Sequence, residues 1–142
     1  RNRDYAEAMI NNLNAVGITA KFEYLKYAAF RDKVQSGGAP FNFGTWGSYS
    51  INDVSAITSH FQSGGKDDYS KDPEVIKQLA IGDTSVDANV RKAAYKAALS
   101  RISGEAFMFP LWSYNTWYAF SKDVDFNPTP DEIPRFFTAK WM

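Results

Sequence analysis

The sequence contains no cysteine, a single histidine and no excess charge of either sign, because 16 Lys and Arg residues balance 16 Asp and Glu residues. Without cysteine the chain can form no disulfide, no thiolate metal site and no cysteine nucleophile. Because His60 stands alone, a two-histidine metal site is excluded as well. The balanced charge argues against a nucleic-acid groove and against a polybasic membrane anchor, since both need a basic excess.

Long apolar runs are missing too. No stretch approaches the roughly 20 residues that a helix needs to span a bilayer, so we expect no transmembrane helix. The sequence also shows no signal-peptide pattern. It begins at Arg1, without a Met, and enters a helical pattern almost at once. We therefore expect it to be a piece cut from a longer protein.

Aromatic residues, by contrast, are abundant, with 11 Phe, 8 Tyr and 4 Trp among 142 residues. Apolar residues make up 44% of the chain and charged residues 23%, which is typical of a globular protein. A chain of this length can bury one core, and we assign most of the aromatic side chains to it.

The first 46 residues alternate between helical and extended patterns. Apolar side chains of a helix over 4–16 recur with helical spacing, and Gly17 follows as its stop. Residues 18–25 alternate as a half-buried strand does. A short helix from Tyr27 ends at residues 36–38, and a second strand covers 41–46. This order is typical of an α/β layer with parallel strand pairing and crossover helices. The apolar face of the first helix comprises Tyr5, Met9, Leu13 and Val16.

After residue 50 the pattern predicts three more helices and then two strands. The helices cover 51–61 with Asn52 as a cap, 73–81 closed by Gly82, and 88–103 closed by Gly104. The strands cover 107–112 and 116–121, residues 127–134 are a proline-rich tail, and 135–141 form a final extended segment. The side chains expected to face inward are Val54, Ile57, Phe61, Val75, Ile76, Leu79, Val90, Ala94, Ala97, Ala98 and Ile102.

No group of residues in the sequence predicts catalysis. His60 has no G-x-S-x-G motif nearby, and we expect it at a helix end, in solvent or against the helix dipole. Residues 64–66 lack the upstream glycine of a phosphate-binding loop. Asp67 and Asp68 lie in a polar loop, so we expect them to be solvated rather than catalytic. We expect no enzyme activity, no cofactor and no metal.

The segment that follows the second strand is the best candidate for a binding site. Residues 44–50 combine glycines, which let a ligand approach the backbone, with Trp46 and Tyr49, which offer flat surface and a polar tip. Ligands of open α/β sheets bind beyond the carboxyl ends of the strands. We therefore predict a recognition loop here rather than a reactive centre.

Five stretches, taken in order, resemble the C-terminal lobe of family 5 extracellular solute-binding proteins, the dipeptide, oligopeptide and nickel-binding components of ABC importers. The resemblance covers about residues 5–126. The stretches are residues 6–18, 41–50, 72–75, 87–98 with Arg91 and Tyr95, and 110–112 followed by Tyr118 and Ala119.

The resemblance implies an α/β fold with a mixed, mainly parallel sheet flanked by helices, as one lobe of a type II (Venus-flytrap) periplasmic binding protein. It implies antiparallel strands near the C-terminus. Residues 1–126 would form the C-terminal lobe, with the N-terminal lobe absent from this chain. Residues 127–142 would be a tail and final extended segment that can cross to the missing lobe.

The function implied by the resemblance is capture of a small solute, a peptide first of all, in the cleft between two lobes. The protein would deliver the solute to ABC permease subunits in the membrane, and it would be periplasmic or attached to the cell surface. The implied ligand-binding residues are Thr45, Trp46, Gly47, Ser48, Tyr49, Ser50 and Asp53.

The chain departs from the family at the ligand-facing loop, which is commonly Trp-x-x-Asp-Tyr. Tyr49 stands where the family has the Asp that pairs with a peptide's ammonium group, and Ser50 stands where it has the Tyr. The nearest acid is Asp53. The ammonium contact therefore does not transfer directly. A non-peptide solute such as an oligosaccharide or a metal chelate remains an alternative, as do a hydrolase that uses paired acids and a protein-interaction module. A lone lobe is also expected to self-associate.

Overall fold

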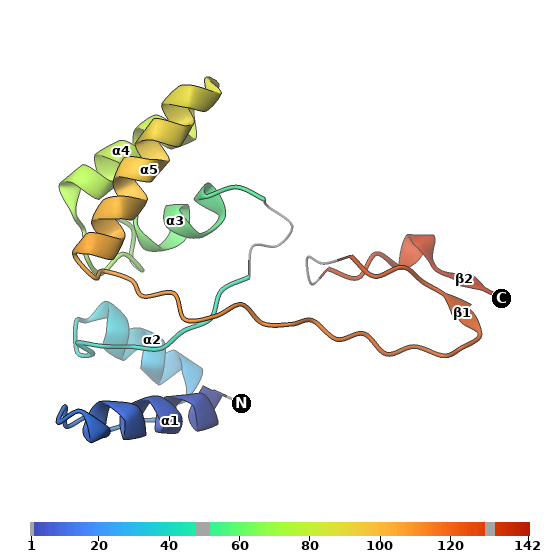
Figure 1. The fold of residues 1–142 in the computed structure, drawn as a ribbon, viewed down its shortest axis with the longest axis horizontal. Helices are drawn as coiled ribbons and strands as arrows, with labels where there is room; N and C mark the ends of the chain where they lie inside the picture. The colour runs from blue at the N-terminus through green and yellow to red at the C-terminus, as the bar shows by residue number, and fades with distance from the viewer. Residues whose placement is uncertain (1, 48–51, 130–132) are drawn as a thin grey trace. The chain divides into compact units, whose positions relative to one another are not determined.

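The computed structural model describes residues 2–47, 52–129 and 133–142, and within them it has five α-helices and one two-stranded sheet (Figure 1). The chain divides into two compact units, residues 1–45 and residues 46–142. The expectation that helices and strands are both present is confirmed. The expected mainly parallel sheet is not formed by the described residues, because their one sheet is small and antiparallel.

The first unit contains α1 (Asn2–Ala15) and α2 (Tyr27–Gln35). Both helices end as the sequence predicts, at glycines in the left-handed backbone region, Gly17 (φ +84°) and Gly37 (φ +77°). After α1, Gly17 donates to the carbonyl of Asn14 (3.0 Å) and Ile18 donates to that of Leu13 (3.0 Å). These two bonds satisfy carbonyls that the helix end would otherwise leave open.

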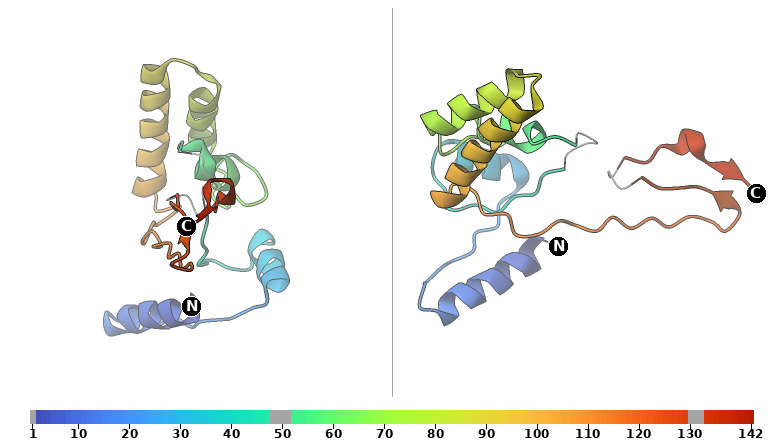
Figure 2. Two further views of the ribbon diagram at one scale, coloured as in Figure 1. Left: turned by 90° about the vertical axis from the view of Figure 1, so that its right-hand side faces the viewer. Right: turned by 45° about the horizontal axis from the view of Figure 1, so that its top comes forward.

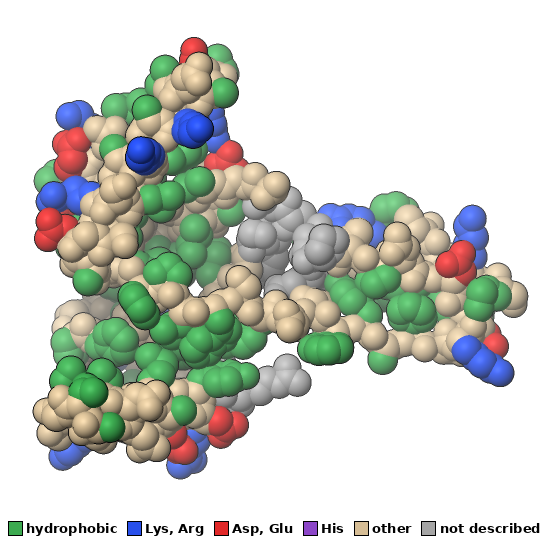
Figure 3. All heavy atoms as spheres, viewed as in Figure 1, with side chains coloured by type: hydrophobic (Ala, Val, Ile, Leu, Met, Phe, Trp, Pro, Cys, Tyr) green, Lys and Arg blue, Asp and Glu red, His purple; other side chains and the backbone are tan. Residues whose placement is uncertain are grey.

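Packing within the first unit is sparse. Ala6 and Val34 are buried, whereas two members of the predicted apolar face, Tyr5 and Val16, are 40% and 73% exposed. That part of the prediction is wrong. A Lys33–Glu23 ion pair joins α2 to the extended segment between the helices, with the two side chains 37% and 59% exposed. Figure 3 shows apolar side chains gathered at the surface in this part of the chain.

The strands predicted over 18–25 and 41–46 do not form in the structure, and these residues have no regular secondary structure. The alternating sequence is present, but a strand exists only where a neighbouring strand accepts and donates its backbone hydrogen bonds. No such partner is present among the described residues. The apolar face of the first segment is accordingly open, with Ile18 54% and Tyr24 73% exposed.

The second unit is built around a helical hairpin of α4 (Pro73–Thr84) and α5 (Ala88–Gly104), which lie side by side in all views (Figures 1 and 2). Asp72 caps α4 by accepting hydrogen bonds from the N–H groups of Glu74 (3.1 Å) and Val75 (2.9 Å). Asp87 caps α5 in the same way. Such a cap stabilises a helix by about 1 kcal/mol. Both helix starts confirm the sequence prediction.

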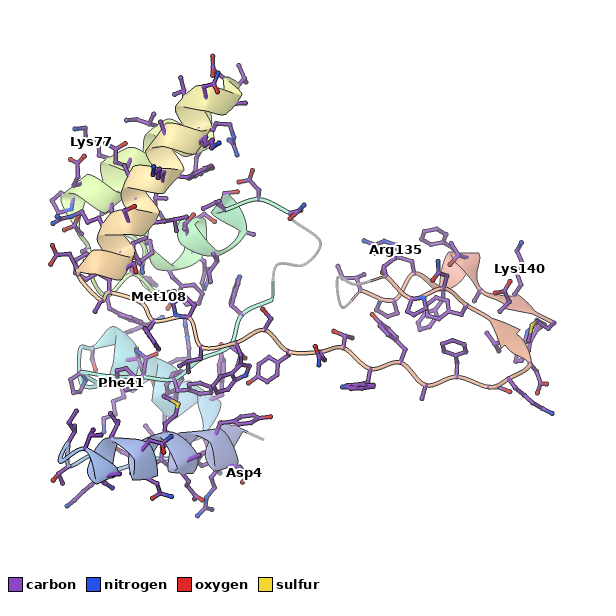
Figure 4. The ribbon with its side chains drawn as sticks, in the orientation of Figure 1. Asp4, Phe41, Lys77, Met108, Arg135 and Lys140 are labelled. Atoms are coloured by element: carbon purple, nitrogen blue, oxygen red, sulfur yellow. The ribbon has the colours of Figure 1, made fainter. Side chains whose placement is uncertain are left out.

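The hairpin encloses the main core of the chain. Predictions for five side chains on its two helices are confirmed, because Val75, Leu79, Ala94, Ala98 and Ile102 are buried. Two others are wrong, since Val90 is 43% exposed and Ala97 is exposed. The central cluster consists of Val75, Leu79, Tyr95, Ala98 and Ile102, with Val54, Phe107 and Met108 packed against it. Figure 4 labels Met108 just beyond α5, and Lys77 on α4.

Of the two glycines that were predicted to close these helices, Gly104 does so and Gly82 does not. Gly82 is buried inside α4, which continues to Thr84. Gly104 is the last residue of α5, and the left-handed residue that follows is Ala106 (φ +55°). Gly82 does not end the helix because it serves packing against Tyr95 instead.

Before the hairpin lies α3 (Ser55–Phe61), which is shorter than predicted. Asn52 is not its cap. The first turn is instead held by Asp53, whose Oδ1 accepts a hydrogen bond from the Ser55 N–H (3.0 Å). Ile57 is 39% exposed, so the expectation that it faces inward is wrong, whereas Thr58 is buried.

After the turn that follows α5, residues 108–121 run without regular secondary structure and without a partner strand (Figure 1), so the strands predicted over 107–112 and 116–121 are not formed. The antiparallel pair near the C-terminus is instead β1 (Val124–Asp125) with β2 (Lys140–Trp141). The 3-10 helix η1 (Phe136–Thr138) lies between them in the chain, just before β2. Phe126 is buried at the centre of a small aromatic cluster. Its ring partners are Tyr118, Phe120 and Phe136.

Candidate functional site

The carboxylate of Asp53 joins two elements, the start of α3 and the side chains of α5. It precedes α3 and receives the Ser55 N–H, and its Oδ2 accepts a hydrogen bond from Nη2 of Arg91 on α5. The hydroxyl of Tyr95 lies 3.3 Å from Oδ1 of Asp53 and donates to Asp83 Oδ1 (2.7 Å). Arg91 and Tyr95 are four residues apart, so they occupy one face of α5. The guanidinium also lies over the Tyr95 ring, 5.1 Å from its centroid.

These contacts shift the pKa values of two groups. Hydrogen bonds from Ser55 first, and then from Arg91, lower the pKa of Asp53 to about 2. Burial, and then the hydrogen bond to Asp83, raises the pKa of Tyr95 to about 12. Asp53 is therefore ionised and Tyr95 is neutral at any physiological pH.

Trp46 is held against α3. Its indole N–H donates to the Ala56 carbonyl (3.1 Å), and its ring stacks on His60, with centroids 4.1 Å apart and planes 20° apart. Phe61 meets Trp46 edge-on at 5.2 Å. The indole is nevertheless 42% exposed. Trp46 thus has a fixed position and an accessible surface.

His60 and Asp67 form a pair next to this aromatic group. His60 Nε2 lies 3.0 Å from Asp67 Oδ2. The expected place of His60 at a helix end is confirmed, because it lies in the last turn of α3 with its side chain 37% exposed. The sequence did not predict that its ring also stacks on Trp46 and contacts Asp67. The expectation that Asp67 and Asp68 are solvated is wrong, since they are 6% and 1% exposed.

Asp68 is buried because it organises the loop between α3 and α4. Its two carboxylate oxygens accept hydrogen bonds from the backbone N–H groups of Gly64 (2.8 Å), Ser70 (3.0 Å) and Lys71 (2.9 Å), and from the Ser70 hydroxyl (2.7 Å). A carboxylate that replaces its water with this many donors can be buried at little cost. Its role is structural.

An open hollow of about 660 Å³ lies where these groups meet. Trp46, Asp53, Ile57, Arg91 and Tyr95 are among the residues that line it. It therefore combines an aromatic surface with one anion and one cation that neutralise each other. Such a surface is suited to holding a ligand.

The structure brings together only part of the predicted ligand-binding set. Trp46 and Asp53 line the hollow, Gly47 follows Trp46, and Thr45 is an exposed residue at the end of the first unit. Ser48, Tyr49 and Ser50, which were also predicted to bind the ligand, lie outside the described residues.

Three residues of the site were not predicted as such, namely Asp83, Arg91 and Tyr95. Arg91 and Tyr95 do have a signal in the sequence, their spacing of four on one helix, and they belong to one of the family-like stretches. Nothing in the sequence, however, links them to Asp53, which is 38 residues before Arg91.

Within the described ranges, no group of three or more His, Cys, Asp or Glu side chains is arranged to hold a metal ion. No helix in the same part of the chain is both long and apolar enough to cross a membrane. Comparisons of this chain with protein-family models, with curated proteins and with solved structures found no match.

Proposed function

We propose that this chain is the C-terminal lobe of an ABC-importer solute-binding protein of the family 5 type, which captures a small solute and delivers it to the permease. The observation that carries the proposal is the order of the family-like stretches along the sequence. Two of those stretches supply Trp46 and the pair Arg91 and Tyr95, which line one hollow. The protein would be periplasmic or attached to the cell surface.

The chemistry of the hollow supports binding rather than catalysis. A general acid or base works best with a pKa near the working pH. Asp53 has a pKa of about 2 and is hydrogen-bonded to Arg91, so it neither gives nor takes a proton readily at neutral pH. A hydrolase that uses Asp53 as one of two acids is therefore the weaker candidate.

The extended segments support the lobe interpretation. Side chains such as Phe22 (40% exposed), Tyr24 (73%) and Phe109 (75%) lie on segments that read as strands in the sequence and have no ladder partner among the described residues. We propose that strands from the rest of a longer protein pair with these extended segments and form a sheet with them, as the Venus-flytrap fold requires. The apolar side chains would be covered at the same time.

The ligand is a peptide or another small solute, held when the two lobes close by a hinge motion. Because Arg91 already neutralises Asp53 and the Ser55 N–H donates to it, its carboxylate is not a free partner for the ammonium group of a peptide. A solute that needs no such contact, such as an oligosaccharide or a metal chelate, is the alternative. Aromatic stacking on Trp46 would serve either ligand.

Calorimetric titration of the full-length protein tests the proposal. The panel contains dipeptides to pentapeptides, free amino acids and small oligosaccharides. Saturable binding of one class at micromolar concentration or below is the expected result. If no class binds, the proposed function loses its support, and turnover of a peptide or glycoside that is lost in Asp53→Asn would favour a hydrolase instead.

A further inference from the structure

The short helix α3 is held at its two ends by different contacts. At the C-terminal end Gln62 is buried, and its side-chain oxygen accepts a hydrogen bond from the Ser70 hydroxyl (3.1 Å) in the loop before α4. Near the N-terminal end Val54 packs against the core of the α4–α5 hairpin. Within the described residues Val54 is the one partly buried apolar side chain of residues 52–61 that packs on this cluster. Apolar packing at the N-terminal end is therefore small.

Polar contacts hold the N-terminal end of α3, where apolar packing is small. The carboxylate of Asp53 binds the first turn of α3 through the Ser55 N–H, and it binds α5 through Arg91. Arg91 is itself fixed, because its Nη1 donates to the carbonyl of Gly82 in α4 (2.7 Å). With its side chain 27% exposed, the guanidinium is partly shielded from water, where ion pairs are stronger than on an open surface.

Trp46 is attached to α3. The indole N–H is bound by the Ala56 carbonyl and the ring is stacked on His60, and both partners belong to this helix. A change in the position of α3 therefore carries Trp46 with it.

We infer that Arg91 is a positioning residue, which holds α3 and Trp46 against the hairpin through Asp53. If the contacts to Asp53 are broken, α3 opens locally while α4 and α5 stay folded, since the hairpin keeps its own core and caps. The importance of this contact for solute recognition rests on the proposed function. The positioning itself does not.

Hydrogen exchange measured by NMR on the 142-residue chain tests the inference. The readout is the exchange rate of the Trp46 indole N–H, assigned with Trp46→Phe, divided by the rate of hairpin amides such as Leu79 and Ala98. In Asp53→Asn, which keeps an oxygen for the Ser55 N–H, we expect this ratio to rise about ten-fold, as local opening does. Arg91→Ala should give the same result.

The pair Arg101 and Asp72 provides a matched control, because it is an Arg–Asp contact at the other end of the same hairpin. Arg101→Ala should change the hairpin amides at least as much as Trp46, so the ratio stays at its wild-type value or falls. An Asp53→Asn protein with an unchanged ratio would show that the contact positions nothing. Equal acceleration at all sites would show a general stabilising role and would also overturn the inference.

A milder variant keeps the test valid if Arg91→Ala fails to fold. Arg91→Lys keeps the positive charge but offers one nitrogen where Arg91 uses two, so the ratio should rise by a smaller factor, about two- to three-fold. An unchanged ratio in both Arg91→Lys and Asp53→Asn would contradict the inference. No solute is added in these measurements. A protein that binds nothing in the titration panel would therefore refute the proposed function and leave this result unaffected.

Discussion

The ring of Tyr95 on α5 occupies the space that a side chain at Gly82 on α4 would need. A Cβ atom at Gly82 would lie 2.6 Å from Cε1 of Tyr95 and 2.9 Å from Cζ, well inside van der Waals contact. The absence of a side chain at this buried position thus allows the two helices to approach. It also places the Tyr95 hydroxyl against Asp83, one residue further along α4.

Gly82→Ala should therefore destabilise the chain, by about 1–3 kcal/mol, because the methyl group displaces a buried ring. Gly104→Ala is the matched control, since a Cβ there meets no atom within 4 Å. It should be neutral or stabilise by up to about 1 kcal/mol through better helix propensity. Urea unfolding followed by circular dichroism measures both changes. Equal effects of the two substitutions would contradict the packing described here.

Ala106 follows α5 in the left-handed backbone region (φ +55°) and donates to the carbonyl of Ser103 (3.3 Å). A residue with a Cβ is strained there and glycine is not. Ala106→Gly should therefore raise the free energy of unfolding by about 0.5–1 kcal/mol. Ala93→Gly, at an exposed position inside α5, should lower it by a similar amount. A loss of stability in Ala106→Gly would show that the left-handed conformation is wrong.

Asp72 is bound by two nitrogens of Arg101, Nε to Oδ1 (2.8 Å) and Nη2 to Oδ2 (2.7 Å), while it caps α4. Its hydrogen bonds, from Arg101 first, lower its pKa from 3.8 to about 2. The ionised form is thus favoured by the folded state. This stabilisation is complete above about pH 4 and is lost as the pH falls through about 2.

Asp72→Asn keeps the helix cap and removes the charge. We expect the stability difference between wild type and this variant to be constant from pH 7 to about pH 5 and to shrink towards pH 2. Denaturation with urea at a series of pH values measures it. A difference that does not change with pH would show that the Arg101 contact does not favour the ionised carboxylate.

Tyr95 affects the pH dependence of stability at alkaline pH. Because its pKa is raised from 10.0 to about 12, the folded state favours the protonated phenol, and this contribution is present below pH 10 and lost as the pH rises through about 12. Tyr95→Phe should cost about 1 kcal/mol at pH 7 through the lost hydrogen bond to Asp83. It should also flatten the loss of stability between pH 10 and 12. Absorbance at the phenolate band, compared between wild type and variant, measures the pKa directly.

Trp46 is the residue that links stability to the proposed binding function. In the full-length protein we expect Trp46→Ala to weaken solute binding by about 1–3 kcal/mol, as a half-buried aromatic anchor does. Ile57→Ala, at a residue that also lines the hollow, should have a smaller effect. Calorimetric titration with the solute class found in the panel measures both. An unchanged affinity in Trp46→Ala would assign the residue a purely structural role.

The helices were predictable because their signals are local. Asp72 and Pro73 mark a helix start through bonds to residues two and three positions away, and Gly17 ends α1 through its own backbone angle. The strands were not predictable in this way. The alternating pattern over 18–25 indicates which side chains share a face, but it does not indicate which strand would pair with the segment. The candidate site was half predictable. Trp46 and Asp53 could be singled out by residue type.

What the sequence by itself determined is where α4 and α5 begin and where α1 and α2 end, which side chains are apolar enough to be buried, and which chemistries lack their residues. What only the tertiary structure decided is which of those side chains meet. Arg91 reaches Asp53 across 38 residues, and Gly82 is a contact for Tyr95 rather than a helix stop. The physical reason is that helix signals act within one or two turns, whereas ion pairs and ring packing depend on how the α4–α5 hairpin closes.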